Sequence, residues 1–267
     1  MQDGLVARAR PLLGTLVSVQ VRGTGAAAAI EAAFEEVALI HRLMSAHAPD
    51  SEIARLARAL PGERIALHPH TAAVLRLTHA WQQVSAGAFD AQRAGERLSA
   101  LGRRPGLQGA TPARGRLSDV HFEGDAVRVP GPLQLDLGGI AKGYAVDQAV
   151  AVLQEHGIAS GLVNAGGDLR AFGPHAWRID VQHPTVWSRT QRLLRLRNAA
   201  IATSVRVAET SDFVATRRRP ASWNRCTVLA RDCTSADALT KWALQQPAPS
   251  LQLRAALARS GARLWRE

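Results

Sequence analysis

Apolar residues recur three or four positions apart in the N-terminal third of the chain, a spacing that predicts amphipathic helices. One helix is expected over residues 26–44 and a second over residues 69–85. Before them, residues 12–21 alternate loosely between apolar and polar side chains and are expected to form a strand. Residues 94–130 are rich in Gly, Pro and Arg, so we expect an irregular connection with a short strand pair near residues 120–129.

The second half of the chain alternates between short apolar runs and helical spacing. In residues 133–168 we expect a first strand in the apolar run that ends at Asp136, a helix that stops at His156-Gly157, and a second strand over residues 161–164. We expect strands at residues 177–181 and 193–196 that pair with each other, and two further strands at residues 226–230 and 262–265. Two further helices are expected at residues 235–241 and 250–259.

Composition restricts the class of protein. The chain has 267 residues, 46% hydrophobic and 21% charged, which is ordinary for a soluble globular protein with one large or two small domains. It has no apolar run of about 18 residues, so no membrane span is expected. Residues 1–15 contain no apolar leader core, cleavage site or lipobox cysteine, so we expect a cytoplasmic protein, or an exported one if a leader was removed.

The net charge of +11 favours either an arginine-rich solvated surface or a partner that carries phosphates. With only 4% aromatic residues there is no stacking platform for nucleic acid, so no nucleic-acid partner is expected. Cys226 and Cys233 belong to no CxxC or Cys/His zinc pattern, and we expect two buried free thiols.

Two double glycines adjoin carboxylates in the central stretch. Asp136 precedes Gly138-Gly139, and Asp168 follows Gly166-Gly167. Glycines at a strand-to-helix turn let backbone amides approach a phosphate, although a tight turn without a ligand explains each pair equally well. Of 33 Lys and Arg residues only two are lysine, and the first follows Gly139 closely, at Lys142. A lysine there supplies a point charge for a phosphate.

Residues 136–147, DLGGIAKGYAVD, and residues 163–168, VNAGGD, resemble a known pair of signatures. The FAD:protein FMN transferases, the ApbE family, show Asp-Leu-Gly-Gly-Ile-Ala-Lys-Gly-Tyr/Phe-x-x-Asp followed by Val-Asn-x-Gly-Gly-Asp. A Rossmann fingerprint does not fit, because no G-x-G-x-x-G follows a strand.

Four other segments resemble the same family. Residues 87–90 match its Gly-Ala-Phe-Asp flavin-binding turn, although Gln92 replaces the usual threonine. Residues 43–52 resemble its Met-Ser…Ser-Glu segment, and residues 198–204 its Ala-Ile-Ala-Thr-Ser segment. Leu13 stands where the family's first motif, Met-Gly-Thr, has a methionine that lies against the flavin.

The resemblance implies a single domain over residues 1–267 with an α+β fold, a mixed sheet and flanking helices, related to the T-fold. It implies FAD as substrate and, as partner, an acceptor flavoprotein whose threonine receives FMN while AMP leaves. The residues implied in flavin binding are Leu13, His47, Ala88, Phe89, Asp90, Asp136, Lys142, Gly166 and Gly167.

The resemblance also implies magnesium, bound by the Gly139 carbonyl, Asp237 and a threonine four residues after that aspartate. In this chain the threonine position is Lys241, and Thr240 stands one residue early. The Lys241 ammonium either occupies the cation site beside Asp237 or points outward while water replaces the threonine. Without any ligand, Asp237 is explained as a capping residue in the first turn of a helix.

The family's His-x-x-Asp-Pro-x-Thr-Gly segment, with its candidate catalytic histidine, is missing. The sequence has no histidine after His183, and residues 205–224 look shortened and rewritten, so no catalytic base is assigned. The expected function is FAD:protein FMN transfer. The alternatives are an FAD-binding protein without turnover and an FAD pyrophosphatase.

Overall fold

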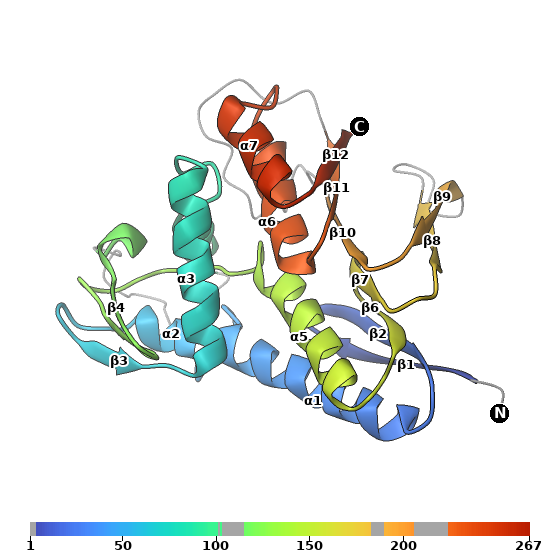
Figure 1. The fold of residues 1–267 in the computed structure, drawn as a ribbon. Coiled ribbons are helices and arrows are strands. Elements are labelled where there is room, and N and C mark those ends of the chain that lie inside the picture. The colour runs from blue at the N-terminus through green and yellow to red at the C-terminus, as the bar shows by residue number, and fades with distance from the viewer. Residues whose placement is uncertain (1–3, 101, 103–114, 183–189, 206–223) are drawn as a thin grey trace.

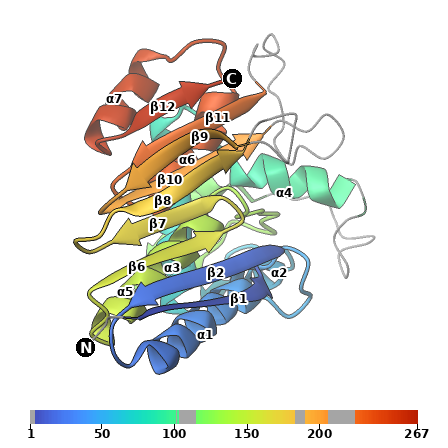
Figure 2. The ribbon, with the colours of Figure 1, turned by 90° about the vertical axis from the view of Figure 1, so that its right-hand side faces the viewer.

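A computed structural model describes residues 4–100, 102, 115–182, 190–205 and 224–267. A seven-stranded sheet runs through the molecule in the order β1-β2-β6-β7-β10-β11-β12 (Figures 1 and 2). Its strands are β1 (Leu5–Leu12), β2 (Thr15–Arg22), β6 (Ser160–Ala165), β7 (Asp168–Phe172), β10 (Ala199–Val205), β11 (Arg225–Ala230) and β12 (Arg263–Arg266).

Three helices lie side by side behind this sheet in Figure 2 and contribute a large share of the core. They are α1 (Ala26–Met44), α5 (Ala141–Glu155) and α6 (Cys233–Leu244). The apolar stripe expected on the first helix is buried, including Ile30, Phe34 and Val37. The sheet's other face is covered by the hairpin of β8 (Trp177–Gln182) and β9 (Thr190–Leu196), whose Trp177 packs in one cluster with Leu162 of β6.

Most of the remaining elements lie on the side of α5 that faces away from the large sheet (Figure 1). The helices there are α2 (Glu52–Leu56), α3 (Pro69–Val84) and α4 (Ala91–Ala100). The last helix, α7 (Leu251–Arg259), lies instead against α6 near the C-terminus. A small sheet has the order β3 (Arg64–Ala66), β5 (Ala126–Arg128), β4 (His121–Glu123), and a short 3-10 helix spans Leu117–Asp119.

The fold is α+β, as expected, and most predicted elements are present. Helices 26–44 and 69–85, the pairing of 177–181 with 193–196, and the short strand pair are confirmed. The two cysteines are free and buried, which is also confirmed. Among the described residues, no helix is long and apolar enough to cross a membrane.

The expected mixed sheet is wrong, because every described pairing in the large sheet is antiparallel. The two-residue turn Gly166-Gly167 joins β6 to β7 as a hairpin, which fixes their opposite directions. The apolar run at residues 133–137 is not a strand either. It passes between α2 and α4, where the Leu133 amide donates to the Leu56 carbonyl and the Asp136 amide to the Ala91 carbonyl, both at 2.9 Å.

Two further expectations are corrected. Residues 12–21 form the end of β1, a turn and β2 rather than one strand, since Leu13 and Gly14 both have left-handed backbone angles, φ 56° and 71°. The connection after residue 90 begins with the helix α4 rather than irregular chain. Its first residues repeat small and apolar side chains at Ala91, Ala94 and Leu98, a helical spacing that Gly95 obscures. A Cβ at Gly95 would lie 2.4 Å from the Gln134 carbonyl oxygen, so this glycine serves close packing.

Candidate functional site

A narrow pocket forms where three segments that are far apart in the sequence meet. They are the α3–α4 connection, residues 136–139 before α5, and the C-terminal half of α6. The pocket is lined by Gly87, Ala88, Phe89, Asp90, Ala91, Arg93, Ala94, Asp136, Gly139, Lys241 and Gln245. Its cavity volume of about 20 Å³ holds little more than one water molecule and is far smaller than a dinucleotide.

The turn at residues 87–90 is built by the ends of two helices. After α3 ends, Ala86 and Gly87 adopt left-handed angles, φ 50° and 77°. Phe89 is buried in the core, and its amide donates to Ser85 Oγ at 2.9 Å. Asp90 Oδ1 accepts the amides of Gln92 and Arg93, both at 3.0 Å, and so caps α4. Asp90 therefore has a structural role as well as a place on the pocket wall.

The pocket segment, residues 136–139, forms a second turn against the first. Asp136 Oδ1 accepts the Gly138 amide at 2.9 Å, which holds the carboxylate beside the double glycine. Gly139 is buried, and α5 follows at Ala141 without a side-chain cap. Amides at this helix start already have partners within the chain, since the Ala141 amide donates to the Leu137 carbonyl at 2.8 Å and the Gly143 amide to Asp237 Oδ2 at 3.3 Å. The positive end of the helix dipole still favours an anion here.

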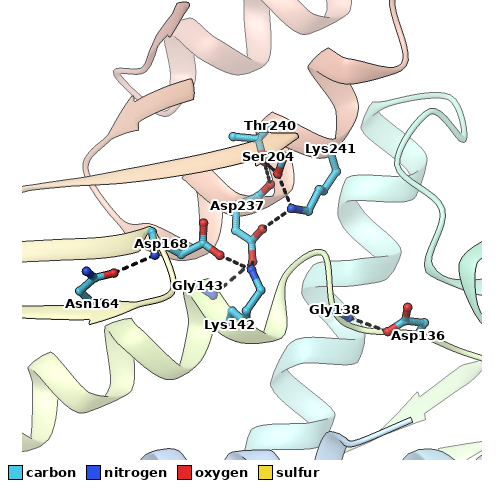
Figure 3. A network of polar contacts seen from close by, with 11 residues as sticks. Asp136, Gly138, Lys142, Gly143, Asn164, Asp168, Ser204, Asp237, Thr240 and Lys241 are labelled. Carbon is cyan, nitrogen blue, oxygen red and sulfur yellow. Dashed lines mark hydrogen bonds and ion pairs between the residues drawn. The ribbon is translucent and has the colours of Figure 1, made fainter. Parts of the chain in front are cut away.

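Behind the pocket lies the lysine–aspartate cluster, defined here as Lys142, Asp168, Asp237 and Lys241 (Figure 3). Lys142 Nζ makes a close ion pair with Asp168 and lies 3.9 Å from Asp237 Oδ2. Lys241 Nζ lies 3.3 Å from Asp237 Oδ1 and also contacts Ser204 Oγ. Both aspartates are buried, with side chains 1% and 0% exposed.

The close approach of α5 and α6 brings these charges together. A Cβ at Gly143 would lie 2.3 Å from the Cys233 carbonyl oxygen, so the glycine after Lys142 is required by helix packing. Asp147, the last residue of the first signature, accepts the amides of Cys233 and Thr234 at 2.9 and 2.8 Å. The second lysine and Asp237 are thereby held against the first lysine.

The neighbouring carboxylates in the cluster favour the protonated, charged form of Lys142. Burial alone would lower the pKa of Lys142, but the carboxylates of Asp237 and Asp168 outweigh it and raise the pKa above its ordinary value. Burial raises the pKa of Asp168, and the nearby Asp237 carboxylate adds to that shift. Two ammonium groups and two carboxylates leave the cluster formally neutral.

The cluster does not fit a divalent cation. Of the two orientations expected for Lys241, the inward one is observed, with a side chain 7% exposed. Both oxygens of Asp237 face an ammonium group, and Oδ2 also accepts the Gly143 amide at 3.3 Å. Thr240 Oγ1 donates to the backbone carbonyl of Asp237 at 2.7 Å rather than lying beside its carboxylate.

The second double glycine forms a hairpin rather than a strand-to-helix turn. Gly166 and Gly167 have φ 63° and 101°, and Asn164 Oδ1 accepts the Gly167 amide at 2.8 Å. A Cβ at Gly166 would lie 2.3 Å from Thr15 Oγ1, so this turn packs against the start of β2. We call residues 166–168 the hairpin segment. It points Asp168 into the cluster.

The predicted flavin-binding residues are only partly brought together. Ala88, Phe89, Asp90 and Asp136 line the pocket, while Lys142 lies behind it in the cluster. The remaining four are outside the set of lining residues: Leu13, His47, Gly166 and Gly167. Leu13 occupies the β1–β2 turn, where its amide donates to His41 Nδ1 at 3.4 Å, and His47 lies on the surface after α1.

Three residues of the pocket and the cluster were not predicted as site residues from the sequence: Arg93, Asp168 and Ser204. Asp168 was visible as the carboxylate that follows the second double glycine, and Ser204 as the end of the Ala-Ile-Ala-Thr-Ser segment. Arg93 had no signal beyond its nearness to residues 87–90. The alternative explanation of Asp237 as a capping residue is wrong, because Asp232 accepts the Ser235 amide and caps α6, and Asp237 lies inside the helix.

Comparison with known sequences decides the family. The family described as the ApbE family matches residues 13–255. The chain belongs to the ApbE family. Two relatives named FAD:protein FMN transferase are those of Treponema pallidum, 31% identical over 185 residues, and Vibrio cholerae, 29% identical over 226 residues. These alignments cover 62% and 73% of this chain and 51% and 66% of the relatives.

A third relative of the same name, from Rhodobacter capsulatus, is 40% identical over 76 residues, which is 27% of this chain and 14% of that protein. The alignments thus span less than two thirds of the length of these relatives. Solved ApbE-family structures share the fold over nearly the whole chain. The ApbE protein of Thermotoga maritima gives a TM-score of 0.82 at 23% identity, covering 98% of this chain and 94% of its own. The flavin transferase ApbE of Vibrio cholerae gives 0.81 at 22%, covering 98% and 93%.

The segment in which the family's candidate catalytic histidine was sought lies largely outside the described residues, which stop at residue 205 and resume at 224. The interpretation of that segment as shortened and rewritten stays a prediction.

Proposed function

We propose that this ApbE-family chain is an FAD:protein FMN transferase. It takes FMN from FAD, attaches it to a threonine of an acceptor flavoprotein, and releases AMP. The observation that carries the proposal is the pocket, which joins the Gly87–Asp90 turn to the pocket segment and Lys241. The names of the Treponema and Vibrio relatives support the same reaction.

The reaction exchanges one phosphorus–oxygen bond for another. The threonine oxygen attacks the phosphorus nearest the riboflavin, and the bond from that phosphorus to the bridging oxygen breaks. AMP leaves with the electron pair, and the hydroxyl proton passes to a base or to solvent. Such a transfer depends on positioning the pyrophosphate and on neutralising the charge that develops on it.

Several groups of this chain are available for that work. Gly139, just before the N-terminus of α5, and the Lys241 ammonium border the pocket, and the positive end of the helix dipole and the ammonium both favour the negatively charged pyrophosphate. Asp136 and Asp90 are fixed by their own backbone contacts and would orient polar groups of the ligand. Magnesium, which the resemblance implies, would neutralise the pyrophosphate when bound, but the residues around Asp237 do not fit it and no step here depends on it.

The test is to incubate the protein with FAD and a flavin-free acceptor that carries FMN on threonine in its mature form. Covalent flavin fluorescence on the acceptor in a denaturing gel, together with stoichiometric AMP, is expected. The matched control is the same acceptor with its target threonine changed to alanine, which should stay unlabelled.

Two other outcomes would overturn the transferase. AMP and free FMN in equal amounts, with or without acceptor, would indicate an FAD pyrophosphatase. Stoichiometric retention of intact FAD without AMP would indicate a flavin-binding protein that lacks turnover.

A further inference from the structure

We infer that the Lys241 ammonium takes the place of a divalent cation at Asp237, so that this chain binds FAD without magnesium. The choice of FAD as the ligand rests on the proposed function. The replacement itself rests on the lysine–aspartate cluster, which is independent of that choice.

The position of Lys241 is the first argument. Its Nζ lies 3.3 Å from Asp237 Oδ1 and contacts Ser204 Oγ (Figure 3). The same residue borders the pocket together with Gly139. The ammonium is therefore held between a buried carboxylate and the pocket. A metal ion that linked this carboxylate to a bound phosphate would need the same place.

The second argument is that the other side of Asp237 is also occupied. Its Oδ2 accepts the Gly143 amide at 3.3 Å and lies 3.9 Å from Lys142 Nζ. Asp168, the other buried carboxylate, is engaged by Lys142 in turn. A divalent cation added here would meet two ammonium groups at close range, and the repulsion between like charges is strong in a buried site.

The third argument comes from composition. Among 33 Lys and Arg residues only Lys142 and Lys241 are lysine, and both converge on the Asp237 carboxylate. An arginine has a planar, forked cation, whereas lysine offers a compact point charge, which resembles a metal ion more closely. A chain that uses arginine almost everywhere else has lysine at the two positions where a compact cation fits.

The first experiment measures FAD binding to the wild-type protein by isothermal titration in magnesium and in EDTA. The dissociation constants should agree within about twofold, below the range of roughly 5- to 150-fold typical of coupled ligands. Tightening by magnesium of about fivefold or more would overturn the inference, because it would show a functioning metal site beside Lys241.

The second experiment follows Mn²⁺ uptake by electron paramagnetic resonance, with and without FAD. Wild type should bind no stoichiometric Mn²⁺. Lys241→Thr frees Asp237 and adds a hydroxyl, so it should bind one equivalent, which is lost again when Asp237→Asn is added. Lys241→Met is the matched control: it removes the charge without supplying an oxygen ligand, and should bind less Mn²⁺ than Lys241→Thr.

Stoichiometric Mn²⁺ on wild type that Asp237→Asn abolishes would overturn the inference. No uptake by folded Lys241→Thr would overturn it too, because Lys241 would then have replaced no metal site. Circular dichroism checks that each variant is folded. If a variant is not folded, the wild-type FAD titrations and the wild-type Mn²⁺ uptake decide whether Lys241 replaces a metal ion. Absence of FAD binding in every condition would remove the proposed function, whereas the Mn²⁺ result would still decide about Lys241.

Discussion

The pocket segment and the hairpin segment look alike in sequence, since each places a double glycine next to an aspartate, yet they differ in structure. In the pocket segment neither glycine has a positive φ, and Asp136 is partly exposed at the pocket wall. In the hairpin segment both glycines have positive φ and Asp168 is 1% exposed. One segment presents groups to a ligand, and the other turns the chain and anchors a lysine.

The difference shows that a Gly-Gly-Asp pattern does not by itself assign a ligand. What separates the two is the partner of each carboxylate. Asp136 Oδ1 accepts its own neighbouring amide, whereas Asp168 pairs with Lys142 from another element. The contrast predicts that the two segments respond differently to substitution.

The largest difference is expected between Asp168→Ala and Asp136→Ala. Removing Asp168 leaves Lys142 without its nearest carboxylate, and breaking a buried ion pair costs about 3–5 kcal/mol. Since the Lys142 side chain is 28% exposed, we expect the lower end of that range. Asp136→Ala should cost less than Asp168→Ala, because the Asp136 side chain is only partly buried; losing its hydrogen bond to the Gly138 amide contributes about 1 kcal/mol. Urea unfolding of both variants measures the two values, and equal losses would contradict the distinction.

A smaller effect is expected from the glycines. Gly166→Ala puts a Cβ 2.3 Å from Thr15 Oγ1 at φ 63°, and strained backbone of this kind costs about 1–3 kcal/mol. The matched control is Gly138→Ala, whose Cβ would lie 3.1 Å from Asp136 Oδ1 at an ordinary φ and should change stability by about 0.5 kcal/mol. Combining Gly166→Ala with Thr15→Ala should recover part of the loss. If the double variant were as unstable as the sum of the singles, contact with Thr15 would not be the cause.

Local sequence was sufficient for the elements whose pattern is regular. Residues 26–44 form α1 as expected because their apolar stripe faces the sheet without interruption. The helix α4 was missed because Gly95 breaks the local propensity, and its reason lies in a distant carbonyl, that of Gln134. The sheet direction was missed because a double glycine serves a hairpin as readily as a strand-to-helix turn.

Most residues of the candidate site could be predicted from the sequence, but which of their side chains meet in space could not. The first signature contains Lys142, the implied magnesium site contains Asp237, and the departure at Lys241 is visible in the sequence. That both lysines meet one carboxylate depends on the close packing of α5 on α6, which no spacing along the chain reports. Ser204 reaches the same place from β10.

Asp90 provides the next test, since it lines the pocket beside Asp136 and also caps α4. Asp90→Ala should lower the free energy of unfolding by about 1 kcal/mol, the usual cost of a lost helix cap. Asp90→Asn keeps a capping oxygen and should keep nearly all of that stability. Thermal unfolding measures how much the helix cap contributes to stability. Isothermal titration of Asp90→Asn with FAD measures how much the Asp90 carboxylate contributes to FAD affinity. An asparagine variant as unstable as the alanine variant would contradict the capping role.

The smallest effect concerns the β1–β2 turn, which adjoins the hairpin segment through Thr15. His41 Nδ1 accepts the Leu13 amide, so the imidazole must be unprotonated at that nitrogen. Burial lowers the pKa of His41 below its ordinary value of 6.5. A group whose pKa is lowered in the folded state contributes stability above its unfolded pKa and loses it as the pH falls.

Stability should therefore decline as the pH falls from about 7.5 to 5.5, with His41 contributing less than about 1 kcal/mol of the decline. His41→Gln retains an oxygen that can accept the Leu13 amide but does not titrate, so its unfolding free energy should depend less on pH. Urea unfolding of both proteins at several pH values isolates the difference. Identical pH dependence of the unfolding free energy in the two proteins would show that protonation of His41 is not linked to the stability of the β1–β2 turn.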